Sequence, residues 1–210
     1  MFDLNTIMMF VTASALLGFA PGPDNIFVLT QSILYGRSAG FIITLGLCTG
    51  LLVHTTVVAL GIAALFKTSV IAFSVLKYLG AAYLLFLAWK AFRASTGAES
   101  IKLEKDKEVP SWSLYRRGII MNVTNPKVSI FFLAFLPQFA DPARGSMTLQ
   151  LVFLGLMFIA VTIVVFGLIS QLSGVIGAWL QRSGQFEKIM NMTAGTVFAA
   201  LAVKLALTRQ

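Results

Sequence analysis

The chain has 210 residues, of which 58% are hydrophobic and only 11% are charged. Soluble domains carry roughly 25% charged residues, so this composition excludes an ordinary soluble fold and predicts a protein that crosses a lipid bilayer several times. The 16 Lys and Arg residues exceed the 8 Asp and Glu residues. Because the positive charges gather between apolar runs, they indicate membrane topology and not a nucleic-acid partner.

Six apolar runs approach or exceed the roughly 20 residues that a membrane-spanning helix needs. No Lys or Arg precedes the first run, so we expect a retained span and not a signal peptide. Uncharged sequence continues beyond the fifth run to Gln181, which predicts a segment along the membrane interface. The expected spans are residues 4–34, 39–66, 71–92, 118–139, 147–170 and 186–207.

These runs divide the chain into a first repeat at 1–92, a hydrophilic linker at 93–117 and a second repeat at 118–210. If both termini lie outside, most Lys and Arg residues of the loops lie inside, as the positive-inside bias requires. The 93–117 loop is then cytoplasmic. All three tryptophans fall at predicted inner boundaries, where amphipathic rings are favoured; they are Trp89, Trp112 and Trp179.

A break of Pro21, Gly22 and Pro23 interrupts the first run and is followed by Asp24 and Asn25. Proline removes a backbone donor, and lipid cannot satisfy the freed backbone groups, so we expect this costly break to serve a function. Pro23 suits the first position of a new helix, whose N-terminus can hold an anion. Asp24 either handles substrate or protons here, or only caps that helix.

A second break, Asn125-Pro126-Lys127, interrupts the fourth run, with Asn122 close before it. Lys127 adds an intramembrane charge of opposite sign to Asp24. The two charges could form a structural ion pair, or Lys127 could extend to water. Alternatively, they could recognise a zwitterion, with the substrate's ammonium at Asp24 and its carboxylate at Lys127. These interpretations are compatible if the substrate replaces a resting ion pair.

The breaks fall in the first span of each half, and two three-span halves joined by one inner loop have opposite orientations. Corresponding broken helices in inverted repeats are typical of secondary transporters. The sequence therefore predicts an all-α membrane protein with six transmembrane helices, a 3+3 inverted repeat, and broken first and fourth helices. An exporter of another small solute, such as a metabolite or a metal ion, is the alternative to amino-acid transport.

The second run carries Gly46, Gly50 and His54 at intervals of four residues, with Gly61 further along the same face. Small residues at this spacing permit close helix packing. His54 is either a proton relay or a neutral, hydrogen-bonded side chain. With one Cys, one His and no nucleotide-binding glycine motif, we expect no metal site, no cofactor and no enzymatic activity, and we expect ion gradients to supply the energy.

Four segments of the chain resemble the lysine exporter (LysE/RhtB) family of bacterial amino-acid exporters. The two most specific are Pro21-Gly22-Pro23-Asp24-Asn25 and Asn122-x-x-Asn125-Pro126-Lys127. The segment from Gly46 to His54 and the segment Lys77-Tyr78-Leu79-Gly80-Ala81-Ala82-Tyr83-Leu84 complete the likeness, which covers nearly the whole chain.

The resemblance implies an inner-membrane protein that exports neutral amino acids or close derivatives, of the threonine, homoserine, homoserine lactone or leucine type. It also implies export driven by proton influx, with Asp24, His54 and Lys127 as coupling candidates, and it is compatible with a homodimer. Members of the family often carry Asn at the position of Asp24. The resemblance therefore favours Lys127 as the indispensable charge.

Overall fold

The computed structural model describes residues 2–68, 70–94, 109–182 and 184–207, and every regular element in these stretches is helical. Two features expected from the sequence lie outside the described part. They are residues 95–108, which form most of the 93–117 linker, and the side chain of Trp179.

The first span is two helices, α1 (Leu4–Phe19) and α2 (Pro23–Tyr35), which meet at an angle of 61°. Asp3 begins α1 because its side chain accepts a hydrogen bond from the backbone N–H of Thr6, which satisfies one free donor of the first turn. Pro23 opens α2, as predicted. Gly36 ends α2 with a φ of 85°, a conformation that glycine adopts most readily.

The next two spans are unbroken helices, α3 (Arg37–Thr68) and α4 (Val70–Arg93). The fourth span begins with α5 (Ser111–Thr124), which starts several residues before the expected position near residue 118. The apolar run in the sequence covers only the part of α5 that lipid could surround. The helix itself begins earlier, among polar residues. After a break at Asn125, α6 (Pro126–Ile130) leads into a π-helix, η1 (Phe131–Phe135), and a 3₁₀ turn, η2 (Leu136–Phe139), and the fourth span bends by 51°.

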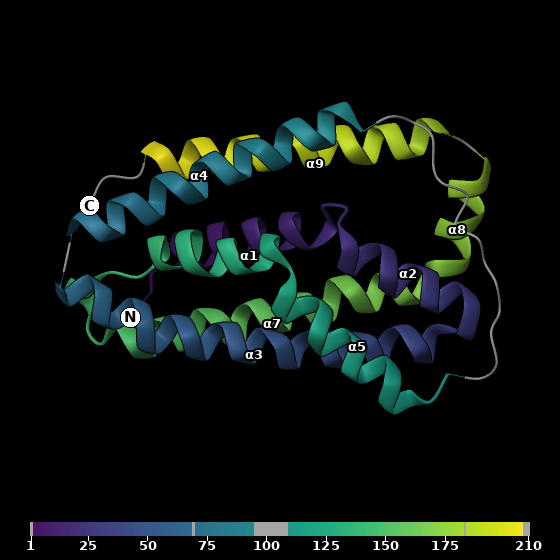
Figure 1. Cartoon of the computed structure of the whole chain (residues 1–210), viewed down its shortest axis with the longest axis horizontal. Helices are drawn as coiled ribbons and strands as arrows, with labels where there is room; N and C mark the ends of the chain where they lie inside the picture. Colours follow the sequence, from purple (N-terminus) through teal and green to yellow (C-terminus); the bar gives the residue numbers. More distant parts are fainter. Residues whose placement is uncertain (1, 69, 95–108, 183, 208–210) are drawn as a thin grey trace.

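The last part of the chain contains a short 3₁₀ turn, η3 (Pro142–Arg144), and three helices, α7 (Met147–Gln171), α8 (Ser173–Arg182) and α9 (Gly184–Leu207). The hydroxyl of Ser146 caps the start of α7. Helix α8 turns across the end of the bundle while α9 runs back along it (Figure 1). The uncharged stretch after the fifth span is therefore a separate helix that crosses the bundle end.

Four of the described helices are long and apolar enough to cross a membrane, and the number rises to six if each bent pair counts as one span. The chain is thus an all-α, multi-pass membrane protein with interrupted first and fourth spans. The start of α1 and the end of α9 lie at the same end of the bundle (Figure 1).

Phenylalanine side chains fill the centre of the bundle. Phe10, Phe131, Phe132 and Phe135 are all fully buried and touch one another or neighbouring rings. Many large apolar side chains on the outside are exposed instead, such as Leu60 at 66%. In a bilayer lipid would cover them, because acyl chains are as apolar as leucine.

Candidate functional site

The two breaks meet in the structure through Lys127. Its ammonium nitrogen Nζ donates hydrogen bonds to the carbonyl oxygens of Ala20 (3.0 Å) and Leu17 (3.3 Å). In an unbroken helix the Leu17 carbonyl would accept a bond from the N–H of residue 21, but Pro21 has no N–H. The break in α1 therefore creates carbonyl acceptors, and the break in the fourth span supplies the cation that satisfies them.

Gly22 makes room for this ammonium. A Cβ atom at Gly22 would lie 3.1 Å from Lys127 Nζ and 3.5 Å from its Cε carbon. The φ of Gly22 is −171°, an extended value that any residue can adopt. Glycine therefore contributes space beside the ammonium at this position, and the backbone conformation does not demand it.

Two asparagines secure the backbone at the breaks. The side-chain amide of Asn25 donates to the carbonyl of Gly18 at 2.6 Å, another acceptor in the last turn of α1. The side-chain oxygen of Asn125 accepts the backbone N–H of Lys127 at 3.0 Å and so caps α6. Each break carries its own hydrogen-bonding side chain, which lowers the cost of exposing backbone groups at this depth.

Asp24 does not have the structural role that we considered for it. The N-cap of α2 is Gly22, and no side chain caps this helix, so the interpretation of Asp24 as a simple cap is wrong. Its carboxylate is 3% exposed and lies beside the side chains of Asn122 and Asn125.

Lys127 also differs from the structural alternatives considered from the sequence. It is buried and its ammonium binds backbone carbonyls, so it does not extend to water. Asp24 and Lys127 do not lie within the 4 Å of an ion pair, whereas Arg144 does so with Asp3 and with Asp141. A direct Asp24–Lys127 ion pair is therefore absent, although the two charges still attract one another electrostatically. The ammonium hydrogen-bonds the carbonyls that the helix break leaves without a partner and does not pair directly with Asp24.

Four buried polar atoms at the breaks have no hydrogen-bond partner among the described residues. They are Oδ1 of Asp24, Oδ1 of Asn25, Oδ1 of Asn122 and Nδ2 of Asn125. Most buried polar groups in folded proteins are hydrogen-bonded, so four such atoms in one place make the breaks a candidate site for a polar ligand.

His54 joins the site from α3. Its Nε2 atom lies 3.2 Å from the carbonyl oxygen of Asn122, and its ring contacts that of Phe132. The hydrogen-bonded arrangement expected for His54 is therefore present. A proton-relay role remains a separate hypothesis.

Glycines place α3 close enough to α5 for this contact. A side chain at Gly46 would collide with the Tyr115 carbonyl, and one at Gly50 would lie 2.7 Å from the Asn122 side chain. The packing role predicted for Gly46 and Gly50 is confirmed. A Cβ at Gly61 would meet nothing within 4 Å among the described residues, so the tight packing stops before Gly61.

The structure thus brings together every residue that the sequence nominated, namely Pro21, Gly22, Pro23, Asp24, Asn25, His54, Asn122, Asn125, Pro126 and Lys127. Sequence reasoning missed the backbone carbonyls of Leu17, Gly18 and Ala20. For Leu17 the signal was available, because Pro21 leaves the carbonyl four residues earlier without its helical partner; the Gly18 and Ala20 carbonyls are free because α1 ends at Phe19.

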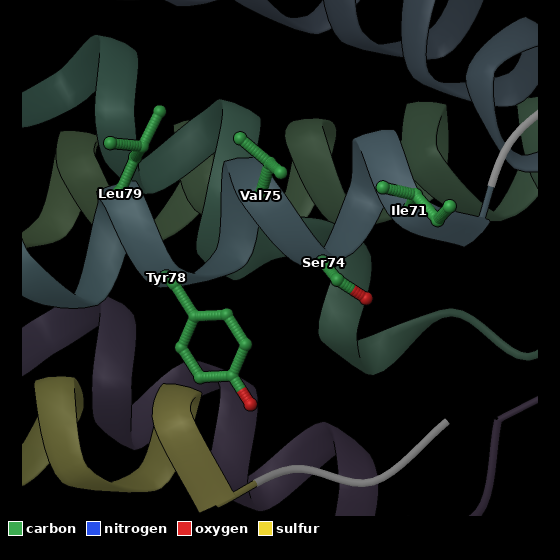
Figure 2. Close-up of a pocket in the computed structure, with 5 residues that line it drawn as sticks. All are labelled: Ile71, Ser74, Val75, Tyr78 and Leu79. Carbon is green, nitrogen blue, oxygen red and sulfur yellow. The ribbon is translucent and has the colours of Figure 1, made fainter.

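A hollow elsewhere on the surface lacks comparable chemistry. It has a volume of about 430 Å³ and is lined by one face of α4, shown in Figure 2. Its residues are Ile71, Ser74, Val75, Tyr78 and Leu79. The wall carries no charge and most of these side chains are strongly exposed, as expected of a surface that faces lipid.

Comparison with known proteins shows which family the chain resembles. The family described as LysE type translocator matches residues 15–209. The homoserine/homoserine lactone efflux proteins of Salmonella typhi and Salmonella typhimurium are each 34% identical over 200 residues, which cover 95% of this chain and 95% of each relative. An uncharacterised membrane protein of Bacillus subtilis is 26% identical over 98% of this chain and 100% of its own length.

No solved structure matches this one. The family match spans both breaks and all the spans after the first turns of α1. Its members are translocators, which agrees with buried polar groups at interrupted helices and with a non-enzymatic role. The chain therefore belongs to the LysE type translocator family.

Proposed function

We propose that this protein is a secondary transporter that exports neutral amino acids or close derivatives, of the threonine, homoserine, homoserine lactone or leucine type, by proton antiport. The observation that carries the proposal is the ammonium of Lys127 on the Ala20 and Leu17 carbonyls, beside the buried carboxylate of Asp24. The similarity to proteins named homoserine/homoserine lactone efflux proteins supports this substrate class.

The first step of the mechanism is an exchange of ammonium groups. Lys127 and an amino acid both carry a primary ammonium with three donors, so the substrate can bind the carbonyls that Lys127 now occupies. Asp24 adds a negative charge, and the unpartnered oxygens of Asn25 and Asn122 add further acceptors. The displaced Lys127 is then available to the carboxylate of a zwitterionic substrate, whereas a lactone, which has no free carboxylate, would use the ammonium site alone.

Proton coupling would use the same charges. Asp24, His54 and Lys127 are the candidates, since each can change its charge and all three are buried at one place. One charge that moves through 100 mV is worth about 2.3 kcal/mol. A single coupled proton could therefore support a concentration ratio of several tens.

Alternating access around the breaks completes the proposal. We assign residues 1–92 and 118–210 as inverted repeats joined by a cytoplasmic linker at 93–117, in the bacterial inner membrane, with both termini outside. The positive-inside bias of the loop residues supports this orientation. The start of α3, which is Arg37, and the end of α4, which carries Lys90 and Arg93, lie at the end of the bundle opposite the termini (Figure 1). A homodimer is compatible with this arrangement.

The test is efflux from vesicles that contain the purified protein and are loaded with a panel of amino acids, with and without a proton gradient. We expect gradient-dependent efflux of small neutral amino acids. Efflux that does not depend on the proton gradient would support the proposed substrate class and reject proton coupling. No efflux of any member of the panel would reject the substrate class in favour of another small solute.

A further inference from the structure

A cluster of aromatic rings lies between the breaks and the end of the bundle that holds the termini. The ring centre of Phe131 lies 5.0 Å from those of Phe135 and Phe158. The ring centre of Phe139 lies 5.1 Å from that of Phe10 and 5.2 Å from that of Phe135. These side chains are buried, and a zwitterion cannot cross buried apolar rings without a large cost. We refer to these residues as the ring cluster, which comprises Phe10 of α1, Phe131, Phe132, Phe135 and Phe139 of the fourth span and Phe158 of α7.

Buried polar groups extend from the breaks along α1 as far as this cluster. Asn25 binds the carbonyl of Gly18, and Ser14 lies one helical turn before Gly18 on the same face. The Ser14 side chain is buried, and its Oγ atom has no hydrogen-bond partner among the described residues. Phe10 is the next residue along this face. The ring cluster therefore marks the boundary of the polar site toward the termini.

The segment that carries four of the six rings has an irregular backbone. The N–H of Leu136 donates to the carbonyl of Phe131, five residues earlier, which makes η1 a π-helix. The 3₁₀ turn η2 follows directly and contains Pro137, which has no N–H to donate. Single π turns and short 3₁₀ stretches inside helices often occur at functional hinges. A π turn holds one extra residue, so its return to α geometry would rotate the following side chains by about 100°.

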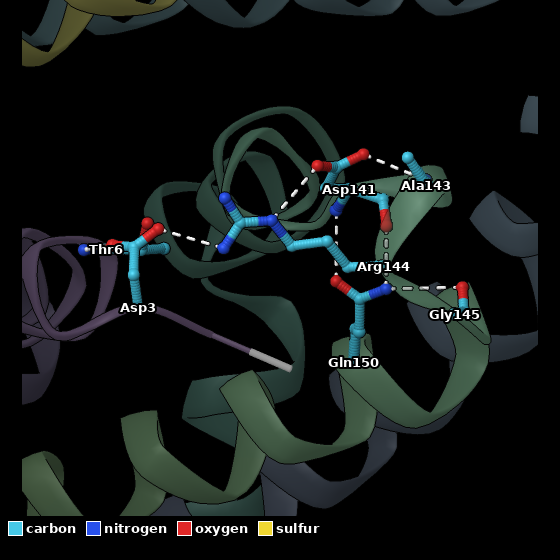
Figure 3. Close-up of polar contacts among 7 residues, drawn as sticks. All are labelled: Asp3, Thr6, Asp141, Ala143, Arg144, Gly145 and Gln150. Carbon is cyan, nitrogen blue, oxygen red and sulfur yellow. Dashed lines mark hydrogen bonds and ion pairs between the residues drawn. The ribbon is translucent and has the colours of Figure 1, made fainter.

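Both ends of this segment are fastened to neighbouring helices. At one end Lys127 binds the free carbonyls of α1. At the other end Gln150 of α7 accepts the backbone N–H of Asp141 at 3.0 Å and donates to its carbonyl at 2.9 Å (Figure 3). Arg144 then donates to Asp3, at the start of α1, at 2.9 Å (Figure 3). With both ends held, the rings between them can rearrange while the segment stays attached to the bundle.

Gly80 of α4 sets how closely this segment packs. A Cβ atom at Gly80 would collide with the Cβ of Ala134 in the π-helix and would lie 3.6 Å from a methyl carbon of Ile130. Gly80 and Ala134 are both buried. Gly80 belongs to residues 77–84, a segment of the family resemblance that contributes nothing to the site at the breaks. The absence of a side chain here lets α4 hold the π-helix against the rings of α1 and α7.

The ring cluster also touches the site at the breaks. The ring centre of Phe132 lies 5.6 Å from that of His54 and 5.2 Å from that of Phe158. The Nε2 atom of His54 lies 3.2 Å from the carbonyl oxygen of Asn122. A movement of Phe132 would therefore change the surroundings of a side chain that contacts the second break.

We propose that the ring cluster is a gate, which closes the breaks toward the end of the bundle that holds the termini and opens when residues 131–139 rearrange. Gly80 is the positioning residue that lets α4 hold the π-helix in the closed arrangement. The inference rests on the proposed function for the solute that crosses the gate, and on the packing of the rings for the closure itself.

Modification of a cysteine behind the rings tests the gate. In a Cys48→Ser background, which removes the one native cysteine, Ser14→Cys places a thiol on the break side of Phe10. A charged, membrane-impermeant methanethiosulfonate is applied to intact cells and to inverted membrane vesicles. Ala143→Cys, at an exposed position near the termini, identifies the preparation in which the reagent reaches that end. In that preparation Ser14→Cys should react much more slowly than Ala143→Cys.

Opening the gate by mutation should expose this thiol. We expect Phe132→Ala to raise the rate of Ser14→Cys modification about tenfold, because the open state of a closed gate is a minor state. Gly80→Ala keeps every ring but displaces the π-helix, so it should also raise the rate. Phe41→Ala removes a ring that faces outward from α3, and Gly167→Ala adds a methyl group in open space. These two controls should leave the rate unchanged.

A solute that crosses the gate should also open it. L-homoserine should accelerate Ser14→Cys modification in the protein with all six rings, whereas a fixed structural plug would show no change. Equal modification of Ser14→Cys and Ala143→Cys, rates that neither Phe132→Ala nor Gly80→Ala raises, or no effect of L-homoserine on a Ser14→Cys protein that transports it would overturn the inference. Vesicle transport by the wild type separates the two proposals. A ring-dependent barrier without amino-acid transport rejects the proposed function alone, and transport without such a barrier rejects the gate alone.

Discussion

The ammonium of Lys127 hydrogen-bonds the carbonyl of Ala20 at 3.0 Å, across 107 positions of the chain. This bond joins the end of one broken helix to the start of another. Lys127 therefore has two roles. It satisfies the Leu17 and Ala20 carbonyls, which the break in the first span leaves without helical partners, and it carries a charge at the proposed substrate site. Stability and transport should therefore depend together on Lys127, and the following experiments distinguish the two effects.

Lys127→Ala should abolish efflux and also lower stability. Each buried carbonyl that loses its partner costs about 1–3 kcal/mol, and the Leu17 and Ala20 carbonyls both lose theirs. Thermal unfolding in detergent and vesicle efflux measure the two effects. Lys188→Ala, which removes an exposed charge of α9, is the control. Near-normal efflux by a correctly inserted Lys127→Ala protein would remove Lys127 from the site.

Gly22→Ala should slow transport by about tenfold, which corresponds to a barrier change of about 1.4 kcal/mol. The new methyl group would lie 3.1 Å from Lys127 Nζ and displace the ammonium from its carbonyls. Gly167→Ala provides the matched control in α7, because a Cβ there meets nothing within 4 Å among the described residues. That control should be neutral or slightly stabilising, since alanine favours helix. Equal transport by both variants would contradict the role assigned to Gly22.

Asp24→Asn should change how efflux depends on pH. The amide keeps the size of the carboxylate and its contacts with Asn122 and Asn125, but it cannot exchange a proton. Efflux rates between pH 5 and 8, in wild type and variant, measure the effect. We expect a flatter profile and a lower maximum rate for Asp24→Asn. Identical profiles would exclude Asp24 from proton coupling and leave His54 and Lys127 as candidates.

Asp3 should make stability depend on pH in acid. Hydrogen bonds from Thr6 and the charge of Arg144 lower the pKa of Asp3 from 3.8 to about 2. A carboxyl group with a lowered pKa stabilises the fold above its unfolded pKa, and that stabilisation is lost as the pH falls toward the folded value. The difference in melting temperature between wild type and Asp3→Ala should therefore be full above pH 4 and shrink between pH 4 and 2.

Asp3→Asn refines this experiment. The amide oxygen can still cap α1, but it carries no charge for Arg144. The stability of Asp3→Asn should lie between those of wild type and Asp3→Ala above pH 4, and residue 3 of this variant does not titrate. The difference in melting temperature from wild type should shrink in acid by the same amount for Asp3→Asn and Asp3→Ala, because both variants lack the titrating carboxyl group. No shrinkage of either difference in acid would mean that the Thr6 hydrogen bonds and the Arg144 ion pair do not lower the pKa of Asp3 in solution.

The sequence by itself determined the class and the elements of this protein. Runs of apolar residues have no alternative to helix in a bilayer, because every backbone group must be satisfied within its own segment. The long helices α3, α4, α7 and α9 therefore begin and end close to the predicted residues. Pro21, Pro23 and Pro126 likewise fixed the positions of the breaks, since the effect of proline is local and steric.

Only the tertiary structure decided which groups meet at those breaks. The sequence offered Asp24 as the partner of Lys127, by opposite charge alone, whereas the structure pairs Lys127 with the Leu17 and Ala20 carbonyls. Hydrogen bonding is directional and acts over about 3 Å, so the choice depends on how α6 approaches the end of α1, where Gly22 leaves space beside the ammonium. Such distances between helices arise from side-chain packing between segments that are distant in the sequence. The hydrophobic periodicity of one segment does not predict them.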